Sequence, residues 1–265
     1  MIKAIAFDLW ETLITNTPDV SREHHRLRIE RMKRILGEGG FAATTERIES
    51  AYREVWQRCH ELYWSADKDI SCRTQIDHFL EVMEVKPFDE RTIQALEDAY
   101  ANVAVEVLPL LVPGAAEIVA EVKGRGYSLG LISNTGRTPG YALRTILDRL
   151  NLSQFFDAMV FSNEHGECKP QRSIFETLRQ SLDVEFEEML FVGDNLYVDV
   201  HGAQQCGMIG VHFLPPTRGD AVAPVPDHDL TIEPHATIHD LRELPQALDA
   251  LSVDLSLPRA RLPRG

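Results

Sequence analysis

The chain has 265 residues, 44% of them hydrophobic, and a formal net charge of -14 at pH 7. This charge argues against a nucleic-acid track or an anionic membrane surface, because both are bound mainly by clustered lysine and arginine. The cysteines, Cys59, Cys72, Cys168 and Cys206, lack C-x-x-C or other metal spacing, which predicts reduced thiols without structural zinc. We expect a cytoplasmic protein, since no signal peptide or uncharged run near the ~20 residues of a membrane span is present.

The first predicted element is a strand over Ile2 to Phe7, and the segment that follows it, residues 16–108, has helical periodicity throughout. Gly37 to Gly40 and the Lys86-Pro87 step interrupt this periodicity, so we expect three or four helices, one of them with Asp89 as its N-cap. The apolar stripes of two of these helices are Ile48, Tyr52, Val55, Cys59 and Leu62, and Ile93, Leu96, Tyr100, Val103 and Val107. Residues 16–108 are therefore predicted to form an inserted helical cap, with hinges near residues 14–20 and 108–114.

Further aliphatic runs predict the remaining strands of a parallel sheet with crossover helices between them. The runs are Ser128 to Ile132, Met159 to Phe161, Met189 to Val192 and Ile209 to Phe213, with Leu230 to Ile232 as a candidate edge strand. The fold class that follows is α/β, a Rossmann-like parallel sheet core over residues 1–15 and 109–250. Residues 251–265 end in a Pro- and Arg-rich stretch that predicts a flexible tail.

Polar residues follow several of these strands, at the edge where open parallel sheets build ligand sites. Asp8 ends the first run, and Ser133-Asn134-Thr135 ends the second, offering a hydroxyl and main-chain N–H groups to phosphate oxygens. Lys169 precedes a helix, and a loop with two carboxylates, Asp194 and Asp199, follows the run from Met189. Taken singly, each piece also fits ordinary capping, turn or solvated roles, but two acids at a strand end favour a cation.

In order and placement these pieces resemble the four signature motifs of the haloacid dehalogenase superfamily, and residues 16–108 look like the cap that this family inserts after its first motif. The resemblance implies a hydrolase, most simply a phosphatase of a small phosphorylated metabolite. It makes Asp8 the nucleophile that forms an aspartyl-phosphate. Ser133 and the main chain of Asn134 would hold the transferring oxygens, and Lys169 would neutralise charge between nucleophile and phosphate.

The same resemblance implies Mg²⁺ as the cofactor. Its ligands would be one oxygen of Asp8, the main-chain carbonyl of Trp10 and Asp194, because Mg²⁺ prefers oxygen ligands. Asp199 would orient Lys169 or a metal-bound water, and Thr12 would hold the loop in place. The sequence predicts neither the substrate's identity nor the oligomeric state.

The chain departs from the phosphatase pattern at Trp10, where those members carry a second Asp that protonates the leaving oxygen and later activates water. An indole does neither, and such acid-base groups are typically worth ~10²- to 10⁴-fold in rate. Three remedies are open: a leaving group that needs no proton, the neighbouring Glu11, or an acid from the cap. The cap candidates are His24, His25, His60 and Glu61.

Two other enzymes of this superfamily and one non-enzyme remain as alternatives. A 2-haloacid dehalogenase fits Trp10, since a halide leaves without a proton, but such enzymes carry neutral residues where Asp194 stands. A phosphonatase needs an activated cap lysine, for which the insertion offers Lys33, Lys68 and Lys86. A non-catalytic binding or regulatory protein would keep the fold and metal site without turnover, although the retained nucleophile argues against it.

Overall fold

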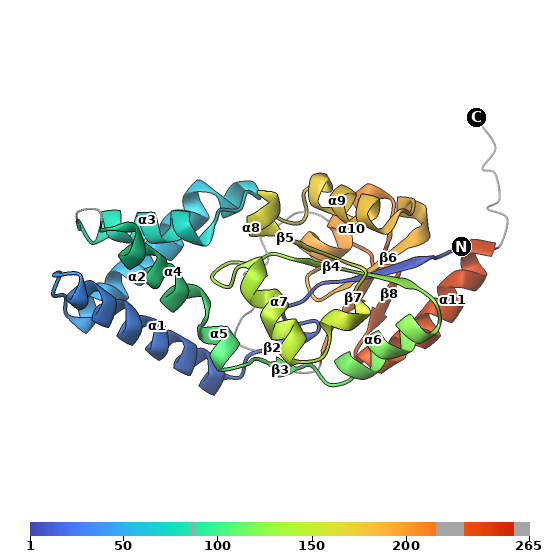
Figure 1. The fold of residues 1–265 in the computed structure, drawn as a ribbon. Coiled ribbons are helices and arrows are strands. Elements are labelled where there is room, and N and C mark those ends of the chain that lie inside the picture. The colour runs from blue at the N-terminus through green and yellow to red at the C-terminus, as the bar shows by residue number, and fades with distance from the viewer. Residues whose placement is uncertain (86–87, 216–230, 257–265) are drawn as a thin grey trace, which may run out of the picture.

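The computed structural model describes residues 1–85, 88–215 and 231–256. Figure 1 shows a sheet flanked by helices and, beyond one end of the sheet, a second group of helices formed by the segment after the first strand. We call that group, residues 18–106, the cap, and the remainder the core. The predicted boundaries of the insertion at residues 16 and 108 stay a prediction.

The core contains six parallel strands in the order β5-β4-β1-β6-β7-β8. Their bounds are β1 Ala4–Phe7, β4 Ser128–Ser133, β5 Ala158–Phe161, β6 Met189–Gly193, β7 Ile209–Phe213 and β8 Ala236–Ile238. Numbered along the core alone, this is the order 3-2-1-4-5-6, which reverses beside β1. Open α/β sheets bind their ligands at such a reversal, here at the carboxyl ends of β1 and β6. The predicted α/β class with a Rossmann-like sheet is confirmed.

Helices cover both faces of the sheet, and alternate residues of β1 divide between them (Figure 1). Ala4 and Ala6 pack with the cluster that includes α9 and α10, whereas Ile5 and Phe7 pack with the cluster that includes α6, α7 and α11. The core helices are α6 Ala115–Gly124, α7 Gly140–Arg149, α8 Ser162–His165, α9 Arg172–Leu182, α10 Gly202–Cys206 and α11 Leu244–Ser256, with a π-helix Leu196–His201 and 3₁₀ turns Ser153–Phe155, Phe186–Glu188 and Leu241–Glu243. Every residue of β1 is buried, as a strand covered on both faces requires.

The cap has a hydrophobic cluster of its own, drawn from residues 29–101. Its helices are α1 Pro18–Glu38, α2 Thr45–Leu62, α3 Cys72–Val82, α4 Glu90–Ala101 and the short α5 Val103–Glu106, with a 3₁₀ turn Trp64–Ala66. A side-chain oxygen caps the amino end of each long helix, from Thr17, Thr44, Ser71 and Asp89. The predicted N-cap is confirmed, since Thr92 N donates to Asp89 Oδ1 at 2.8 Å.

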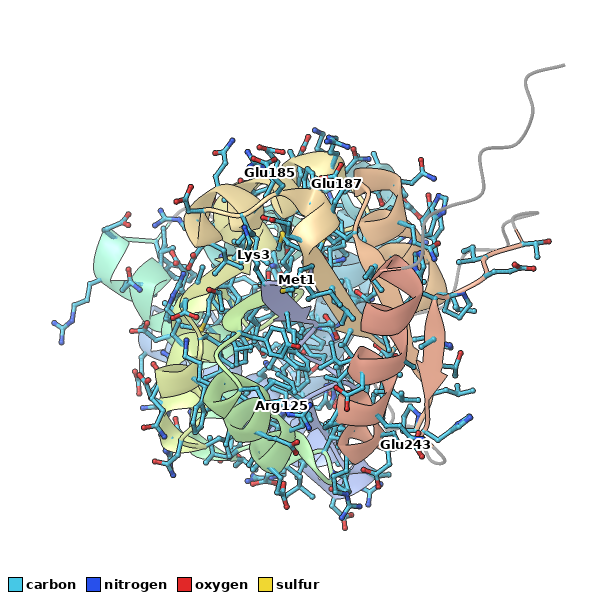
Figure 2. The ribbon with its side chains drawn as sticks, turned by 90° about the vertical axis from the view of Figure 1, so that its right-hand side faces the viewer. Met1, Lys3, Arg125, Glu185, Glu187 and Glu243 are labelled. Atoms are coloured by element: carbon cyan, nitrogen blue, oxygen red, sulfur yellow. The ribbon has the colours of Figure 1, made fainter. Side chains whose placement is uncertain are left out.

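The two chain crossings between core and cap lie side by side. Strand β2, Ile14–Thr15, pairs antiparallel with β3, Leu110–Leu111, in a separate two-stranded sheet. Both crossings fall inside the predicted hinge regions. Met1 and Lys3 lie at the opposite end of the core, among Arg125, Glu185, Glu187 and Glu243 (Figure 2), so the carboxyl end of β1 faces the cap.

Three predictions differ from the structure or fall outside it. The edge strand is Ala236–Ile238, and Thr231 and Ile232 are not in a strand. Helix α11 extends to Ser256, so the predicted tail shares its first six residues with a helix, and residues 257–265 lie outside the described chain. Lys86-Pro87 also falls outside it. No helix in the described ranges is long and apolar enough to cross a membrane.

Candidate active site

Asp8 stands directly after β1 and is held by a tight loop. Thr12 Oγ1 donates to Asp8 Oδ2 at 3.1 Å, and the main-chain nitrogen of Asp8 donates to the carbonyl of Val192 on β6. The loop turns at Glu11, whose φ of 59° is left-handed, and Glu11 N donates to Ile14 O at 2.7 Å. Thr12 thus contacts the predicted nucleophile itself, and its predicted role in fixing the loop is compatible with this geometry.

Lys169 is buried between two carboxylates, although it comes from a distant part of the sequence. Its Nζ lies 2.5 Å from Asp8 Oδ1 and 2.7 Å from Asp199 Oδ1, and it donates to the carbonyl of Ile132 at 3.0 Å. Burial alone lowers the pKa of a lysine, but attraction to Asp199 and Asp8 outweighs it and raises the pKa of Lys169 to about 12. The ammonium therefore stays charged at neutral pH.

Asp8 has the opposite balance. Burial disfavours its ionised form, and the nearby charge of Asp199 adds to this effect, while Lys169 opposes it. Burial outweighs the attraction to Lys169, so the pKa of Asp8 is raised to about 6. A cation beside this carboxylate would favour its ionised, nucleophilic form.

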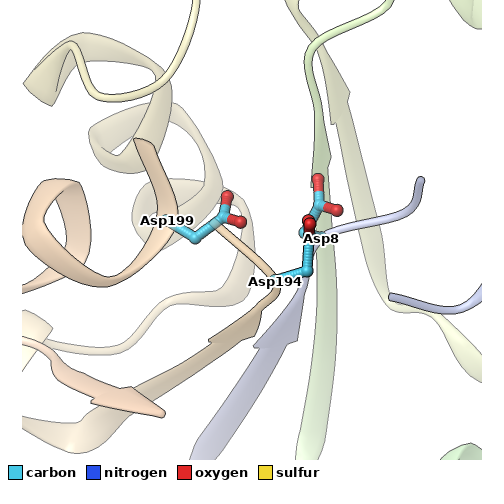
Figure 3. A group of neighbouring side chains, drawn as sticks. All are labelled: Asp8, Asp194 and Asp199. Atoms are coloured by element: carbon cyan, nitrogen blue, oxygen red, sulfur yellow. The ribbon is translucent and has the colours of Figure 1, made fainter. Parts of the chain in front are cut away.

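Asp8, Asp194 and Asp199 form an acidic cluster at the ends of β1 and β6 (Figure 3). One carboxylate oxygen from each lies within 4.8 Å of the other two. Carboxylate oxygens at this spacing are the donors that a hard cation such as Mg²⁺ prefers. The cluster fits a hard divalent cation in both donor type and spacing, while the predicted Trp10 carbonyl ligand stays a prediction.

The turn after β6 explains how two acids approach each other. A side chain on Gly193 would collide with the carboxylate of Asp199, so only glycine permits that approach. Asn195 N donates to Asp199 Oδ2 at 3.0 Å, leaving the other oxygen toward Lys169. His212 on β7 places Nε2 3.0 Å from the main-chain oxygen of Asp194. Sequence reasoning missed His212, which looks there like any buried strand residue.

Ser133 and Asn134 also come to this edge of the sheet. Ser133 is fully buried at the end of β4, and its hydroxyl donates to the carbonyl of Asn134 at a long 3.4 Å. Asn134 Nδ2 donates to the Lys169 carbonyl at 3.1 Å, and Lys169 N donates to Asn134 Oδ1 at 2.9 Å. The structure thus brings the predicted catalytic and binding residues together, and it adds a side-chain role for Asn134 in holding the Lys169 loop. Their roles in catalysis stay predictions.

The position of the missing acid is filled by the Trp10 indole, which is half-buried against the core cluster. Glu11 is buried, and its carboxylate accepts from Thr15 Oγ1 at 2.9 and 3.0 Å. These contacts direct the Glu11 carboxylate toward β2, where it supports the connection to the cap.

The cap candidates for an acid lie elsewhere. His24 is buried with Nε2 2.7 Å from the carbonyl oxygen of Val107, and burial lowers the pKa of its imidazole. His25 is half-buried, and His60 and Glu61 are exposed. Within the described part of the chain, no hydrogen bond joins any of the four to the predicted nucleophile.

One buried cap carboxylate escaped the sequence analysis. Asp69, 7% exposed, accepts hydrogen bonds from Thr135 and Ser162 of the core. No periodicity or motif distinguishes this acid in the turn between α2 and α3, because its importance depends on how the cap docks.

Comparisons with known proteins agree on one group of enzymes. The profile of a hydrolase family described as haloacid dehalogenase-like hydrolase matches residues 2–207. A glyceraldehyde 3-phosphate phosphatase of Pyrococcus abyssi is 32% identical over 80% of this chain and 82% of its own. A ribulose-1,5-bisphosphate 5-phosphatase of Halopiger xanaduensis is 28% identical over 83% and 88%. Among solved structures, a 2-haloacid dehalogenase from Pseudomonas syringae pv. tomato aligns with a TM-score of 0.70 at 22% identity, covering 95% of this chain and 100% of that one.

Proposed function

Because this chain belongs to the haloacid dehalogenase-like hydrolase family, we propose that it is a Mg²⁺-dependent phosphatase of a small phosphorylated metabolite, with Asp8 as its nucleophile. The observation that carries the proposal is the contact of Asp8 with Lys169 at 2.5 Å, with Asp194 and Asp199 clustered beside it. The two relatives named as phosphatases support the substrate class.

In the proposed reaction an oxygen of ionised Asp8 forms a bond to phosphorus while the bond from phosphorus to the leaving oxygen breaks. Lys169, which already contacts Asp8, offsets the charge as carboxylate and phosphate approach. The Ser133 hydroxyl is free of any strong hydrogen bond in the described structure and can donate to a transferring oxygen. Water then attacks the aspartyl-phosphate, which regenerates Asp8 and releases inorganic phosphate.

Asp8 and Asp194 would hold Mg²⁺, with Asp199 beside Lys169 as the orienting acid. The bound ion would lower the electrostatic cost of bringing two anions together, a cost of several kcal/mol in a site of low dielectric. The chain's own contribution is to fix these carboxylates on rigid strand ends.

Trp10 narrows the proposed substrates. With no carboxylate at this position and none of the cap candidates bonded to Asp8, a leaving group that departs without a proton suits the site best. An acyl or aryl phosphate has such a leaving group, so we expect the chain to favour activated phosphates over alkyl phosphates.

Dehalogenation is the second candidate, and Trp10 is the observation that favours it. The likeness to a solved dehalogenase lies at 22% identity and speaks for the fold alone. Asp194 within the acidic cluster favours the metal-dependent reaction.

The test is phosphate release from an aryl phosphate with Mg²⁺, with a chelator, and with the Asp8→Asn variant. We expect Mg²⁺-dependent turnover that falls at least about 10⁴-fold in the variant, because it lacks the nucleophile. The matched control is Asp157→Asn, which changes a carboxylate on the core surface away from the cluster. Halide release from a 2-haloacid without metal, combined with no phosphate release, would overturn the proposal in favour of dehalogenation.

A further inference from the structure

A short cap segment lies against the core segment that ends at Lys169. Asp69 N donates to the carbonyl of Gly166 at 3.0 Å, and Cys168 N donates to the carbonyl of Asp67 at 2.7 Å. Lys68 and Glu167 stand opposite each other in the same antiparallel contact and form an exposed ion pair. The contact therefore ends one residue before the lysine that binds Asp8.

The carboxylate of Asp69 connects this segment to the core through its side chain. Oδ2 accepts from Thr135 Oγ1 at 3.0 Å and from Ser162 Oγ. Oδ1 faces the cap, where it accepts from Trp64 Nε1 and from Ile70 N, each at 2.8 Å. Among the described residues, Oδ2 thus receives donors of the core and Oδ1 donors of the cap.

The two core donors belong to the loops that carry the proposed catalytic groups. Thr135 follows Ser133 and Asn134 at the end of β4, and Ser162 follows β5 and begins the segment leading to Lys169. Thr135 N donates to Ser162 Oγ at 2.9 Å, which joins the two loops near Asp69.

The same two loops are also linked to each other near the active site. Asn134 and Lys169 exchange two hydrogen bonds, at 2.9 and 3.1 Å. The loops are therefore joined to each other at both places, and at one of them the joint is completed by a cap residue.

We propose that Asp69 is a positioning residue, through which the docked cap fixes the Ser133–Asn134 loop and the Lys169 loop relative to Asp8. The inference rests on the proposed phosphatase function and deepens it, because it makes the geometry of the core site depend on the cap. A misplacement of about 1 Å can cost about 10²-fold in rate even when the change is remote from the chemistry.

Asp69→Asn tests this role with little change in shape. Its amide oxygen can keep the bonds from Trp64 and Ile70, which places the NH₂ group against Thr135 and Ser162. An NH₂ group donates and does not accept, so the hydroxyl protons of Thr135 and Ser162 lose the acceptor that they share. We expect kcat to fall about 10- to 100-fold while KM changes less than about threefold.

Lys68→Ala is the matched control, because it removes the exposed ion pair of the same contact and leaves Asp69 intact. We expect its kcat to stay within about twofold of wild type, as exposed ion pairs contribute little. Ser162→Ala removes the hydrogen bond to Asp69 from the core side, and it tests the same role if Asp69→Asn fails to fold. If the two residues act together, the double variant loses less than the product of the single losses.

Backbone hydrogen exchange gives a readout that needs no turnover. We expect faster exchange at the amides of Thr135 and Lys169 in Asp69→Asn and no change there in Lys68→Ala. Unchanged exchange, an unchanged kcat, or an equal kcat loss in Lys68→Ala would each overturn the positioning role. A wild-type protein without phosphate release would instead refute the proposed function, and the exchange result alone would then decide whether Asp69 holds the loops.

Discussion

Lys169 shows how three acidic side chains coexist at one end of a sheet. It and Asp199 are each 1% exposed, and isolated buried charges of either sign would carry a large desolvation cost. Three carboxylates meet one ammonium in this cluster, so negative charge remains in excess. That excess suits a divalent cation. The raised pKa of Asp8 comes chiefly from burial of its carboxylate, and the nearby charge of Asp199 adds to it.

The raised pKa of Asp8 predicts that Mg²⁺ binding weakens in acid. Below about pH 6 a proton occupies Asp8 and competes with the ion, whereas above it the carboxylate is ionised but costly until the ion binds. We expect Mg²⁺ to raise Tm more at about pH 7.5 than at about pH 5. Thermal unfolding with and without Mg²⁺ measures this, with Asp194→Asn as the variant that loses the shift. Equal shifts at both pH values would contradict the assignment of Asp8 as a ligand.

At the scale of elements, the loop between β1 and β2 combines two tasks. Its first half presents Asp8 with Thr12 behind it, and its second half enters the two-stranded sheet that leads to the cap. Trp10 lies between Asp8 and Thr12 in this loop and packs its indole on the core. At this position the loop therefore has a hydrophobic contact in place of the acid that the phosphatase pattern has.

Trp10→Asp is expected to restore an acid at the cost of this contact. We expect the ratio of alkyl-phosphate to aryl-phosphate kcat/KM to rise, by up to about 10²-fold, since only the poorer leaving group needs the proton. Unfolding free energy should fall by about 1 to 3 kcal/mol, because a half-buried indole is lost. Trp10→Asn is the control of equal size without a titratable group. A substrate ratio that moves equally in both variants would argue against a missing acid at this position.

The apolar runs of the sequence predict the five longer strands closely, because each lies in a buried parallel sheet where nearly every residue is hydrophobic. The sixth strand, Ala-Thr-Ile at 236–238, is too short and too mixed to stand out. The candidate edge strand at 230–232 differs from it, since Thr231 and Ile232 are not in a strand, and Leu230 lies outside the described residues. Asp8, Lys169 and Asp194 could be predicted as site residues because strand ends and a family resemblance mark them. Asp69 was not, because its partners Thr135 and Ser162 are distant in sequence and only cap docking joins them.

For the whole molecule, the arrangement of the cap and core places the candidate active site at the end of the core that faces the cap. The carboxyl ends of the strands face the cap, and the opposite end of the core carries charged side chains such as Lys3, Arg125 and Glu243 (Figure 2). The cap's own hydrophobic cluster shares no residue with the two clusters that include the sheet, and Ala104 of α5 packs in one of the latter. Most apolar packing therefore lies within each part, while the proposed positioning role of Asp69 links the two.

The pairing of Thr15 with Leu110 has a further consequence, which is that the cap could be removed from the chain without separating the ends of the core. Directly opposed residues of an antiparallel pair have Cα atoms about 4.5 to 5.5 Å apart, so the cap is a cassette whose two ends nearly touch. Replacing residues 16–109 with a two-residue Asn-Gly turn would convert β2 and β3 into an ordinary β-hairpin. We expect this minimal chain to unfold cooperatively and to keep its Mg²⁺-dependent Tm shift, yet to hydrolyse phosphate esters poorly. Loss of cooperative unfolding would show instead that the cap is part of the folding unit, and that the core does not fold without it.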